Sequence, residues 1–145
     1  MTGIYVGAKY SELSKQKLVK IINELEIPNP VAPKDLHTTI IYSRINGKVN
    51  LSKDFLAARL YKIDYFTSRK DERVCVLLLQ SRDFMNEHMR IMSEDKNLTY
   101  DYDRYIPHIT LSYNVPLEFN VQKKFEVGED YLLVAREYEE ELKEL

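Results

Sequence analysis

A short segment that contains a histidine, with a threonine two residues later, occurs twice in the sequence and constrains the fold more than any other feature. The first copy, residues 35–43, reads DLHTTIIYS, and the second, residues 106–113, reads IPHITLSY. Both copies are rich in Ile, Thr and Tyr and lie near proline, a pattern typical of β-strands. We therefore predict that each copy forms a strand.

The alternation of side chains along a strand places both histidines beside a hydroxyl group. Successive side chains point to opposite faces of a strand, so His37 and Thr39 should share one face, as should His108 and Thr110. These are two of only three histidines in the chain. A histidine next to a hydroxyl on a rigid strand is a suitable unit for acid–base chemistry at a phosphate.

The elements that precede each histidine segment are also repeated. Hydrophobic spacing and serine N-caps predict helices that begin at Ser11 and Ser81, 70 residues apart, while His37 and His108 are 71 residues apart. This common offset favours an internal structural duplication over two segments that share a spacing by chance. Two similar lobes would place their histidine strands on either side of one cleft.

The fold predicted from this order is α+β, with two pseudo-symmetric lobes of antiparallel sheet and outer helices around a central cleft. A chain of 145 residues fits a single domain, residues 1–145, in which the duplication covers about residues 3–43 and 73–113. The other predicted elements are, in chain order, a strand over 3–8, a helix over 11–26, an extended segment over 55–67, a strand over 73–80, a helix over 81–95, and a terminal hairpin of 119–127 and 131–142 around 128–130. The glutamate-rich end could equally be helical.

The composition favours a small ligand in a pocket over a polymer on a surface. The net charge is −2, whereas a protein that tracks a long nucleic acid usually carries a basic surface. Cys75, the only cysteine, lies in an apolar run and is predicted to be a buried, inert thiol, which fits a reducing, cytoplasmic setting. No apolar run approaches the ~20 residues that span a membrane, and the first residues do not resemble a secretory signal. We therefore expect neither long nucleic acid nor a membrane as a partner.

Two histidines that face one phosphate can divide the acid and base roles of phosphodiester cleavage. Imidazole, with an ordinary pKa near ~6.5, accepts a proton in its neutral form and donates one as imidazolium. The hydroxyls of Thr39 and Thr110 could donate hydrogen bonds to the phosphate oxygens. This scheme needs no metal and no cofactor, and the sequence shows neither zinc-ligand spacing nor a glycine-rich phosphate loop. Which histidine is the acid and which is the base stays open.

Strand alternation also sorts the neighbours of the four motif residues. Thr38 and Ser112 should point away from the cleft, so we interpret them as structural. Tyr42 and Tyr113 each follow a histidine by five residues, and this opposite parity favours packing against a helix over ligand contact. His88 lies on the apolar face of the second predicted helix, which indicates a core or boundary position.

Aromatic and basic residues near the predicted cleft are candidates for ligand contact. Flat rings can stack on nucleobases, and the candidates are Tyr5, Tyr65, Phe66, Tyr100, Tyr102 and Tyr105. The basic residues near predicted loop ends that could meet a phosphate are Lys34, Arg44, Arg69, Lys70 and Arg104.

The paired motifs resemble those of the 2H phosphoesterase superfamily, which carries two His-x-Thr/Ser-x motifs, with x usually apolar, in a duplicated α+β fold. The motifs of this chain are residues 37–40, HTTI, and 108–111, HITL. Thr38 departs mildly from the pattern, because an apolar residue is usual there. Within the superfamily, the chain looks like the phage anti-CBASS cyclic-oligonucleotide phosphodiesterases in residues 3–7 (GIYVG), 36–39 (LHTT) and 105–108 (YIPH).

This resemblance implies a metal-independent hydrolase that degrades the cyclic di- and trinucleotide messengers of bacterial antiviral defence, such as 3′,3′-cyclic GMP–AMP, in the cytoplasm of an infected bacterium. A ribose 2′-hydroxyl would attack the adjacent 3′–5′ phosphodiester. The resulting 2′,3′-cyclic phosphate would then be hydrolysed to a terminal 3′-phosphate. His37, Thr39, His108 and Thr110 would be the catalytic residues.

Recognition of the bases is predicted to fall to three residues outside the paired motifs. The resemblance implies aromatic stacking, for which we predict Tyr5, and a carboxylate near the C-terminal strand that reads a base edge, for which we predict Glu137. Tyr105, in the loop before His108, is the third predicted substrate-binding residue.

Two alternative functions stay open. An enzyme that acts on RNA ends with 2′,3′-cyclic phosphates, or on 2′–5′ oligonucleotides, would share the catalytic residues and differ in its pocket. A non-catalytic sponge would bind and sequester the cyclic nucleotide. A sponge does not need two titratable groups, so the paired motifs favour an enzyme.

Overall fold

The described residues form a sheet of six antiparallel strands whose two edge strands carry the histidine segments. The computed structural model describes residues 2–53, 55–102, 104–126 and 131–142. The elements are β1 (Gly3–Tyr10), α1 (Glu12–Glu24), η1 (Pro33–Asp35), β2 (His37–Ser43), β3 (Ala57–Thr67), β4 (Arg73–Gln80), α2 (Arg82–Glu94), β5 (His108–Ser112) and β6 (Tyr131–Leu142). The strand order is β2-β1-β6-β3-β4-β5.

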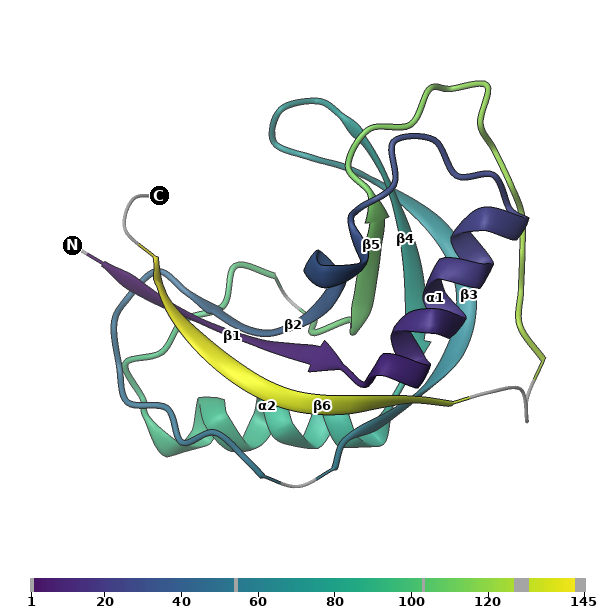
Figure 1. Cartoon of the computed structure of the whole chain (residues 1–145). Helices are drawn as coiled ribbons and strands as arrows, with labels where there is room; N and C mark the ends of the chain where they lie inside the picture. The colour runs from purple at the N-terminus through teal and green to yellow at the C-terminus, as the bar shows by residue number, and fades with distance from the viewer. Residues whose placement is uncertain (1, 54, 103, 127–130, 143–145) are drawn as a thin grey trace.

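The sheet curves so strongly that its two edges meet. β2 and β5 stand at opposite ends of the strand order, yet they contact each other, as Figure 1 shows. Helix α2 contacts β2 and β3, and α1 contacts β6. The strands β2-β1-β6 make one lobe and β5-β4-β3 the other, which confirms the predicted α+β fold with two pseudo-symmetric lobes.

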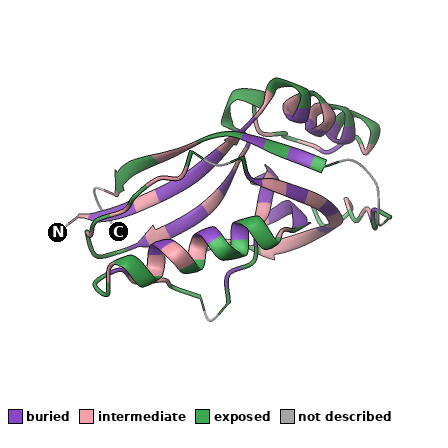
Figure 2. Ribbon diagram, turned by 90° about the horizontal axis from the view of Figure 1, so that it is seen from below, coloured by how far each residue is buried: buried purple, intermediate pink, exposed green. Residues whose placement is uncertain are grey.

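Both helices begin at the serines that the sequence indicates. Ser11 Oγ accepts a hydrogen bond from the Ser14 N–H, and Ser81 Oγ accepts one from the Phe84 N–H. Such caps each contribute about 1 kcal/mol. Each helix buries one side against the protein and leaves the other exposed (Figure 2). Among the described residues, no helix is long and apolar enough to cross a membrane.

Most buried apolar side chains form one core that is shared by both lobes. In β1, alternate residues such as Ile4, Val6 and Ala8 face this core. The Cys75 thiol is fully buried in it, and burial raises its pKa to about 11, as expected for an inert thiol. β4 is buried on both faces, and its second face forms a smaller cluster of Val74, Val76 and Leu78 with Tyr61 and Phe66.

β-Bulges occur at matching positions of the two lobes. Ile40 is left unpaired in β2 against β1, and Leu111, 71 residues later, is left unpaired in β5 against β4. In the same way, Ala135 is the extra residue of β6 against β1, and Tyr61 is the extra residue of β3 against β4. A bulge shifts the residues after it to the opposite face from the one that strict alternation predicts. The matched positions support the proposal that the sequence is an internal duplication.

The predicted terminal hairpin is wrong. β6 forms as expected, but its partners are β1 and β3, so both of its edges are already hydrogen-bonded. The segment before it instead runs beside β3 and makes an isolated bridge between Lys124 and Lys62. The turn that was predicted at 128–130 lies outside the described residues.

Candidate active site

The curvature of the sheet brings the two histidine strands together, and each imidazole ring is held in the same way. His37 Nδ1 lies 2.7 Å from the Asp35 carbonyl oxygen, and His108 Nδ1 lies 2.8 Å from the Ile106 carbonyl oxygen. A carbonyl oxygen can only accept a hydrogen bond, so Nδ1 of each ring carries the hydrogen. Nε2 is therefore the atom left for a substrate, with a lone pair in the neutral ring or an N–H in the imidazolium.

His108 has apolar surroundings that favour its neutral form. Burial lowers the pKa of His108, and the charge of nearby His37 lowers it further, while the hydrogen bond to the Ile106 carbonyl acts in the opposite direction. The Phe66 ring meets the imidazole edge-on, with centroids 5.3 Å apart. Leu78 lies directly opposite His108 in the β4–β5 ladder. A neutral imidazole is the form that can act as a base.

Thr39 and Thr110 lie on the same strand faces as the histidines. Both are partly exposed, whereas Thr38 and Ser112 are fully buried and point away, as predicted. Ser112 has the same parity as His108, so it is the bulge at Leu111, and not strict alternation, that turns Ser112 inward. The hydroxyl oxygens of Thr39 and Tyr5 are 2.9 Å apart. The two motif threonines are thus placed to present hydroxyl groups to a ligand between β2 and β5.

A hollow of about 480 Å³, which we call the His37 hollow, opens beside the first motif. Its lining residues are Tyr5, Lys9, Asp35, His37, Thr39, Tyr42, Tyr113, Tyr138, Glu140 and Leu142. Tyr113 belongs to the second lobe, so the hollow is built by both lobes. On the His108 side, Phe66 helps to line another hollow of about 700 Å³. Aromatic side chains therefore flank both histidines.

The bulges overturn the prediction that Tyr42 and Tyr113 pack against helices. In each strand the bulge residue, Ile40 or Leu111, and the residue after it are both buried. The alternation is interrupted there, so the following tyrosine returns to the histidine face. Both tyrosines line the His37 hollow.

Tyr138 and Lys9 are residues of the His37 hollow that the sequence did not indicate. Tyr138 lies opposite Gly7 in the β1–β6 ladder, and its ring centroid is 5.9 Å from that of Tyr5. A Cβ atom on Gly7 would lie 2.7 Å from the Tyr138 ring, so the missing side chain lets this ring lie over β1. Lys9 lies opposite His37 in the β1–β2 ladder. Both positions depend on strand pairing between distant segments, which no local pattern shows.

Tyr105 lies behind the first motif and does not line the His37 hollow. It is buried, and its hydroxyl donates a hydrogen bond to the Thr39 carbonyl oxygen at 2.7 Å. Its ring stacks on that of His88, with centroids 4.2 Å apart and planes at 4°. His88 is half-buried, near the predicted boundary position, and its Nδ1 donates to the carbonyl oxygen of the bulge residue Ile40 at 2.7 Å. Tyr105 therefore supports the backbone of β2 at the first motif.

Glu137 lies on the face of β6 that turns away from the His37 hollow. The Ser52 backbone N–H donates to its Oε1 at 3.4 Å, and Glu87 of α2 is its neighbour. Burial and then Glu87 raise the pKa of Glu137 to about 8, so it holds a proton at neutral pH. The bulge at Ala135 reverses the faces to which the later side chains of β6 point. As a result Glu140 is the β6 carboxylate that lines the His37 hollow. This placement argues against the predicted base contact of Glu137.

Two of the arginines predicted near loop ends bind an aspartate. Arg44 Nη2 and Arg69 Nη2 each lie 2.9 Å from Asp101 Oδ2. Hydrogen bonds from these guanidinium groups, above all from Arg44, lower the pKa of Asp101. Because Arg44 follows β2 and Arg69 lies between β3 and β4, Asp101 links the two lobes.

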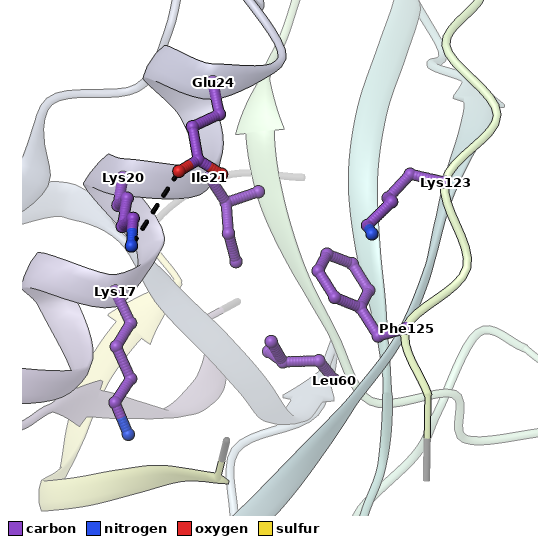
Figure 3. Close-up of a pocket in the computed structure, with 7 residues that line it drawn as sticks. All are labelled: Lys17, Lys20, Ile21, Glu24, Leu60, Lys123 and Phe125. Carbon is purple, nitrogen blue, oxygen red and sulfur yellow. Dashed lines mark ion pairs between the residues drawn. The ribbon is translucent and has the colours of Figure 1, made fainter. Parts of the chain in front are cut away.

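A hollow between α1 and residues 123–125 contains none of the predicted site residues. It has a volume of about 380 Å³, and Figure 3 shows its lining residues, Lys17, Lys20, Ile21, Glu24, Leu60, Lys123 and Phe125. Lys20 Nζ is 3.9 Å from Glu24 Oε1, and Lys123 Nζ is 5.1 Å from the Phe125 ring centroid. In the described part of the chain, no three His, Cys, Asp or Glu side chains form a group that could hold a metal ion.

Comparison with known sequences identifies the family. The profile of the anti-CBASS protein Acb1 matches residues 2–145. The chain belongs to the anti-CBASS protein Acb1 family. Acb1 of Enterobacteria phage T4 is 40% identical to this chain, covering 98% of it and 90% of the phage T4 protein. Acb1 of Salmonella phage S16 is 36% identical, also over 98% of this chain and 90% of the relative.

This Acb1 family member shares its fold with two solved proteins. The protein TT0787 of Thermus thermophilus matches with a TM-score of 0.66 and 18% identity, over 96% of this chain and 87% of that protein. E. coli LigT in its apo form matches with a TM-score of 0.60 and 14% identity, over 94% of this chain and 84% of LigT. At such identities the likeness concerns the fold, so the function must be argued from the residues of the site.

Proposed function

We propose that the chain is a metal-independent phosphodiesterase that cleaves the 3′–5′ bonds of cyclic di- and trinucleotide messengers, such as 3′,3′-cyclic GMP–AMP. One observation carries this proposal: both histidines hold Nδ1–H on a backbone carbonyl, so that Nε2 of each ring is available at the junction of β2 and β5. With both rings in this tautomer, one imidazole can take a proton from the attacking group while the other gives a proton to the leaving group of a phosphodiester.

The lowered pKa of His108 supports its assignment as the base in the first step. Neutral His108 takes the proton of a ribose 2′-hydroxyl, and the O2′ atom attacks the adjacent phosphorus. His37, as imidazolium, gives its Nε2 proton to the departing O5′ oxygen. The hydroxyls of Thr39 and Thr110 donate hydrogen bonds to the non-bridging oxygens, where negative charge increases in the transition state.

The second step uses the same residues with reversed roles. After the first step His108 is protonated and His37 is neutral. His37 takes a proton from water, the resulting hydroxide attacks the 2′,3′-cyclic phosphate, and His108 returns its proton to the O2′ oxygen. The product is linear and ends in a 3′-phosphate, and no metal ion takes part.

The His37 hollow supports recognition of a nucleobase. Tyr5 keeps its predicted role as a stacking residue, and Tyr42, Tyr113 and Tyr138 surround the same space. Burial raises the pKa of the Tyr5 hydroxyl well above its ordinary value, so the group stays protonated and able to donate. We assign the carboxylate that reads a base edge to Glu140, which lines the hollow.

We also propose that the chain counters CBASS signalling in the cytoplasm of an infected bacterium. The phage relatives carry the name anti-CBASS protein, and they match nearly the whole chain. Removal of a cyclic messenger would silence such a defence without any contact between this protein and the enzyme that makes the messenger.

The test is to incubate the purified protein with 3′,3′-cyclic GMP–AMP in excess EDTA and to identify the products by mass. We expect linear products, and we expect His37→Ala and His108→Ala each to lower kcat by about 10²–10⁴-fold, the usual contribution of an acid or base. A substrate with 2′-deoxyriboses should resist cleavage, because it lacks the attacking group. Circular dichroism of each variant controls for folding.

Other outcomes of this experiment would replace the proposal. Tight binding without turnover would identify a sponge. Turnover of an RNA end with a 2′,3′-cyclic phosphate, but not of the cyclic dinucleotide, would identify an RNA-end enzyme. Equal cleavage of the 2′-deoxy substrate would show that the nucleophile is not the ribose hydroxyl.

A further inference from the structure

The two halves of the site differ at one pair of equivalent positions, each of which lies opposite a histidine. Lys9 faces His37 across the β1–β2 ladder, and Leu78 faces His108 across the β4–β5 ladder. These two positions are equivalent, because each lies directly before the same bulge, opposite Ala135 in one lobe and Tyr61 in the other. The lobes therefore present an ammonium group beside one histidine and a hydrocarbon side chain beside the other.

The ammonium group of Lys9 is held at the wall of the His37 hollow. Its Nζ donates to the Lys34 carbonyl oxygen at 3.1 Å and lies 5.4 Å from the centroid of the Tyr138 ring. Among the described residues, no carboxylate forms an ion pair with Nζ. A lysine ammonium group has three N–H donors, so the contact with the carbonyl leaves two of them for a ligand. The carbonyl and the ring restrain the long side chain, which lowers the entropy cost of binding an anion.

We propose that Lys9 binds the scissile phosphate on the His37 side of the site and thereby makes the two halves of the site unequal. This inference rests on the proposed function. A phosphodiester carries one negative charge, and the equivalent position beside His108 offers only Leu78. The phosphate is thus drawn toward the lobe whose histidine donates the proton, while His108 keeps the apolar surroundings that suit a base.

The ammonium group also opposes the charge that develops during cleavage. As the O5′ bond breaks, negative charge increases on the phosphate oxygens and on the leaving oxygen. A charge-assisted hydrogen bond from a restrained donor is stronger than a neutral one, and loss of one preorganised donor commonly lowers kcat by about 10²–10³-fold. Lys9 is partly exposed to solvent, so we expect a smaller effect, about 10–10²-fold in kcat/KM.

The experiment compares Lys9→Met, which keeps most of the side-chain length, with Lys9→Arg, which keeps the charge. Lys20→Met is the matched control, because Lys20 lies on α1 in a different hollow. The first measurement is the Kd of a 2′-deoxy cyclic dinucleotide, at low and at high salt. The second is kcat and KM for the ribose substrate in EDTA. Thermal melts show whether each variant is folded.

We expect Lys9→Met to weaken binding of the 2′-deoxy ligand about 10-fold, to flatten the salt dependence of its Kd, and to lower kcat. Lys9→Arg, which keeps the charge, should keep most of the wild-type affinity, salt dependence and kcat. Lys20→Met should behave as wild type. Lys9→Met with unchanged Kd, salt dependence and kcat would overturn the role of Lys9 while cleavage by the wild type still supports the phosphodiesterase. Lysine-dependent binding without any cleavage would support the Lys9 site and overturn the phosphodiesterase. A wild-type protein that neither binds nor cleaves these ligands would overturn both.

Discussion

At the scale of single residues, two motifs with the same sequence pattern acquire different properties from their surroundings. His37 opens into a hollow with hydroxyl groups and a lysine, whereas His108 contacts Phe66 and faces Leu78. Both rings have the same tautomer, because each Nδ1 donates to a backbone carbonyl. The difference between them therefore lies in solvation and nearby charge, which supports the different roles that we propose for the two histidines.

The pH dependence of kcat/KM should report this difference. Burial lowers the pKa of His108, so the rate should rise with pH as His108 loses its proton, on a limb centred below the ordinary pKa of histidine. At higher pH the rate should fall as the general acid of the proposed mechanism loses the proton that it must donate, which gives a bell-shaped profile. Phe66→Ala admits water beside His108, so it should move the acidic limb to higher pH.

Steady-state kinetics across the pH range, for wild type and Phe66→Ala, measure this shift. Phe55→Ala is the matched control, because the Phe55 side chain is 85% exposed, and its acidic limb should coincide with that of wild type. An acidic limb that stays in place in Phe66→Ala, or that moves to lower pH, would contradict the role assigned to burial.

At the scale of elements, the bulges decide which side chains of a strand reach the site. One extra residue in β2 and one in β5 return Tyr42 and Tyr113 to the ligand side. One extra residue in β6 turns Glu137 toward α2 and brings Tyr138 to the His37 hollow. The Tyr138 ring occupies the space above Gly7, where any side chain would clash with it. The packing of β6 on β1 therefore depends on the glycine at position 7.

Gly7→Ala should disturb β6 through Tyr138. The new Cβ would lie 2.7 Å from the Tyr138 ring, and the ring must move into the His37 hollow to avoid it. Overpacking of this kind typically costs about 1–3 kcal/mol of stability, and ligand affinity should fall as the hollow narrows. Urea unfolding of Gly7→Ala, Tyr138→Leu and the double variant measures the coupling, because Tyr138→Leu removes the clashing atoms. Additive losses of stability in the double variant would show that the ring and Gly7 do not interact.

Local features of the elements could be predicted from the sequence, whereas the positions of the bulges could not. Serine caps and hydrophobic spacing are local signals, so both helices were predicted close to their ends. The faces of His37 and Thr39 were also predictable, because they precede the bulge in their strand. Tyr42 lies after the bulge, and its face was predicted wrongly. A bulge arises from the fit between two paired strands, so its position is set by a partner that the local sequence does not reveal.

The same limit explains the errors at the C-terminal strand. A hairpin with the preceding segment was the simplest partner for residues 131–142, but β6 joins the lobes by pairing with both β1 and β3. Only that pairing brings Tyr138 and Glu140 beside His37 and turns Glu137 away. Lys9 was missed for the same reason, since its place opposite His37 follows from the register of β1 and β2.

At the scale of the whole molecule, each of the two histidine strands, β2 and β5, is held by the segment that leads into the other one. The loop before β5 supports β2, since the Tyr105 hydroxyl donates to the Thr39 carbonyl oxygen at 2.7 Å. The loop before β2 supports β5, since the Val31 N–H donates to the carbonyl oxygen of the bulge residue Leu111 at 2.8 Å, and the Ser112 hydroxyl donates to the Asn29 carbonyl oxygen at 2.9 Å. Neither half of the site is complete without a segment from the other half.

We therefore expect the two lobes to unfold together. Far-UV circular dichroism and tyrosine fluorescence should follow the same urea transition, as they do for a two-state domain. Tyr105→Phe removes the side-chain donor to the part-buried Thr39 carbonyl oxygen, which should cost about 1–3 kcal/mol and shift both probes equally. Tyr131→Phe is the matched control, because Tyr131 is 45% exposed, and it should change stability by less than ~0.5 kcal/mol. Separate transitions for the two probes would show that the lobes are independent.

The matched bulges have a consequence for the way such a protein can change over generations. They fix the histidines and threonines in equivalent places, while the neighbouring strands β1 and β4 carry different side chains at equivalent places, such as Lys9 and Leu78. If the proposed function is correct, one lobe can therefore accept substitutions that suit a new base or ring size while the reaction itself is left intact. Under the proposed function, a phage that carries a member of this family can respond to an altered messenger by changing a few wall residues of one lobe.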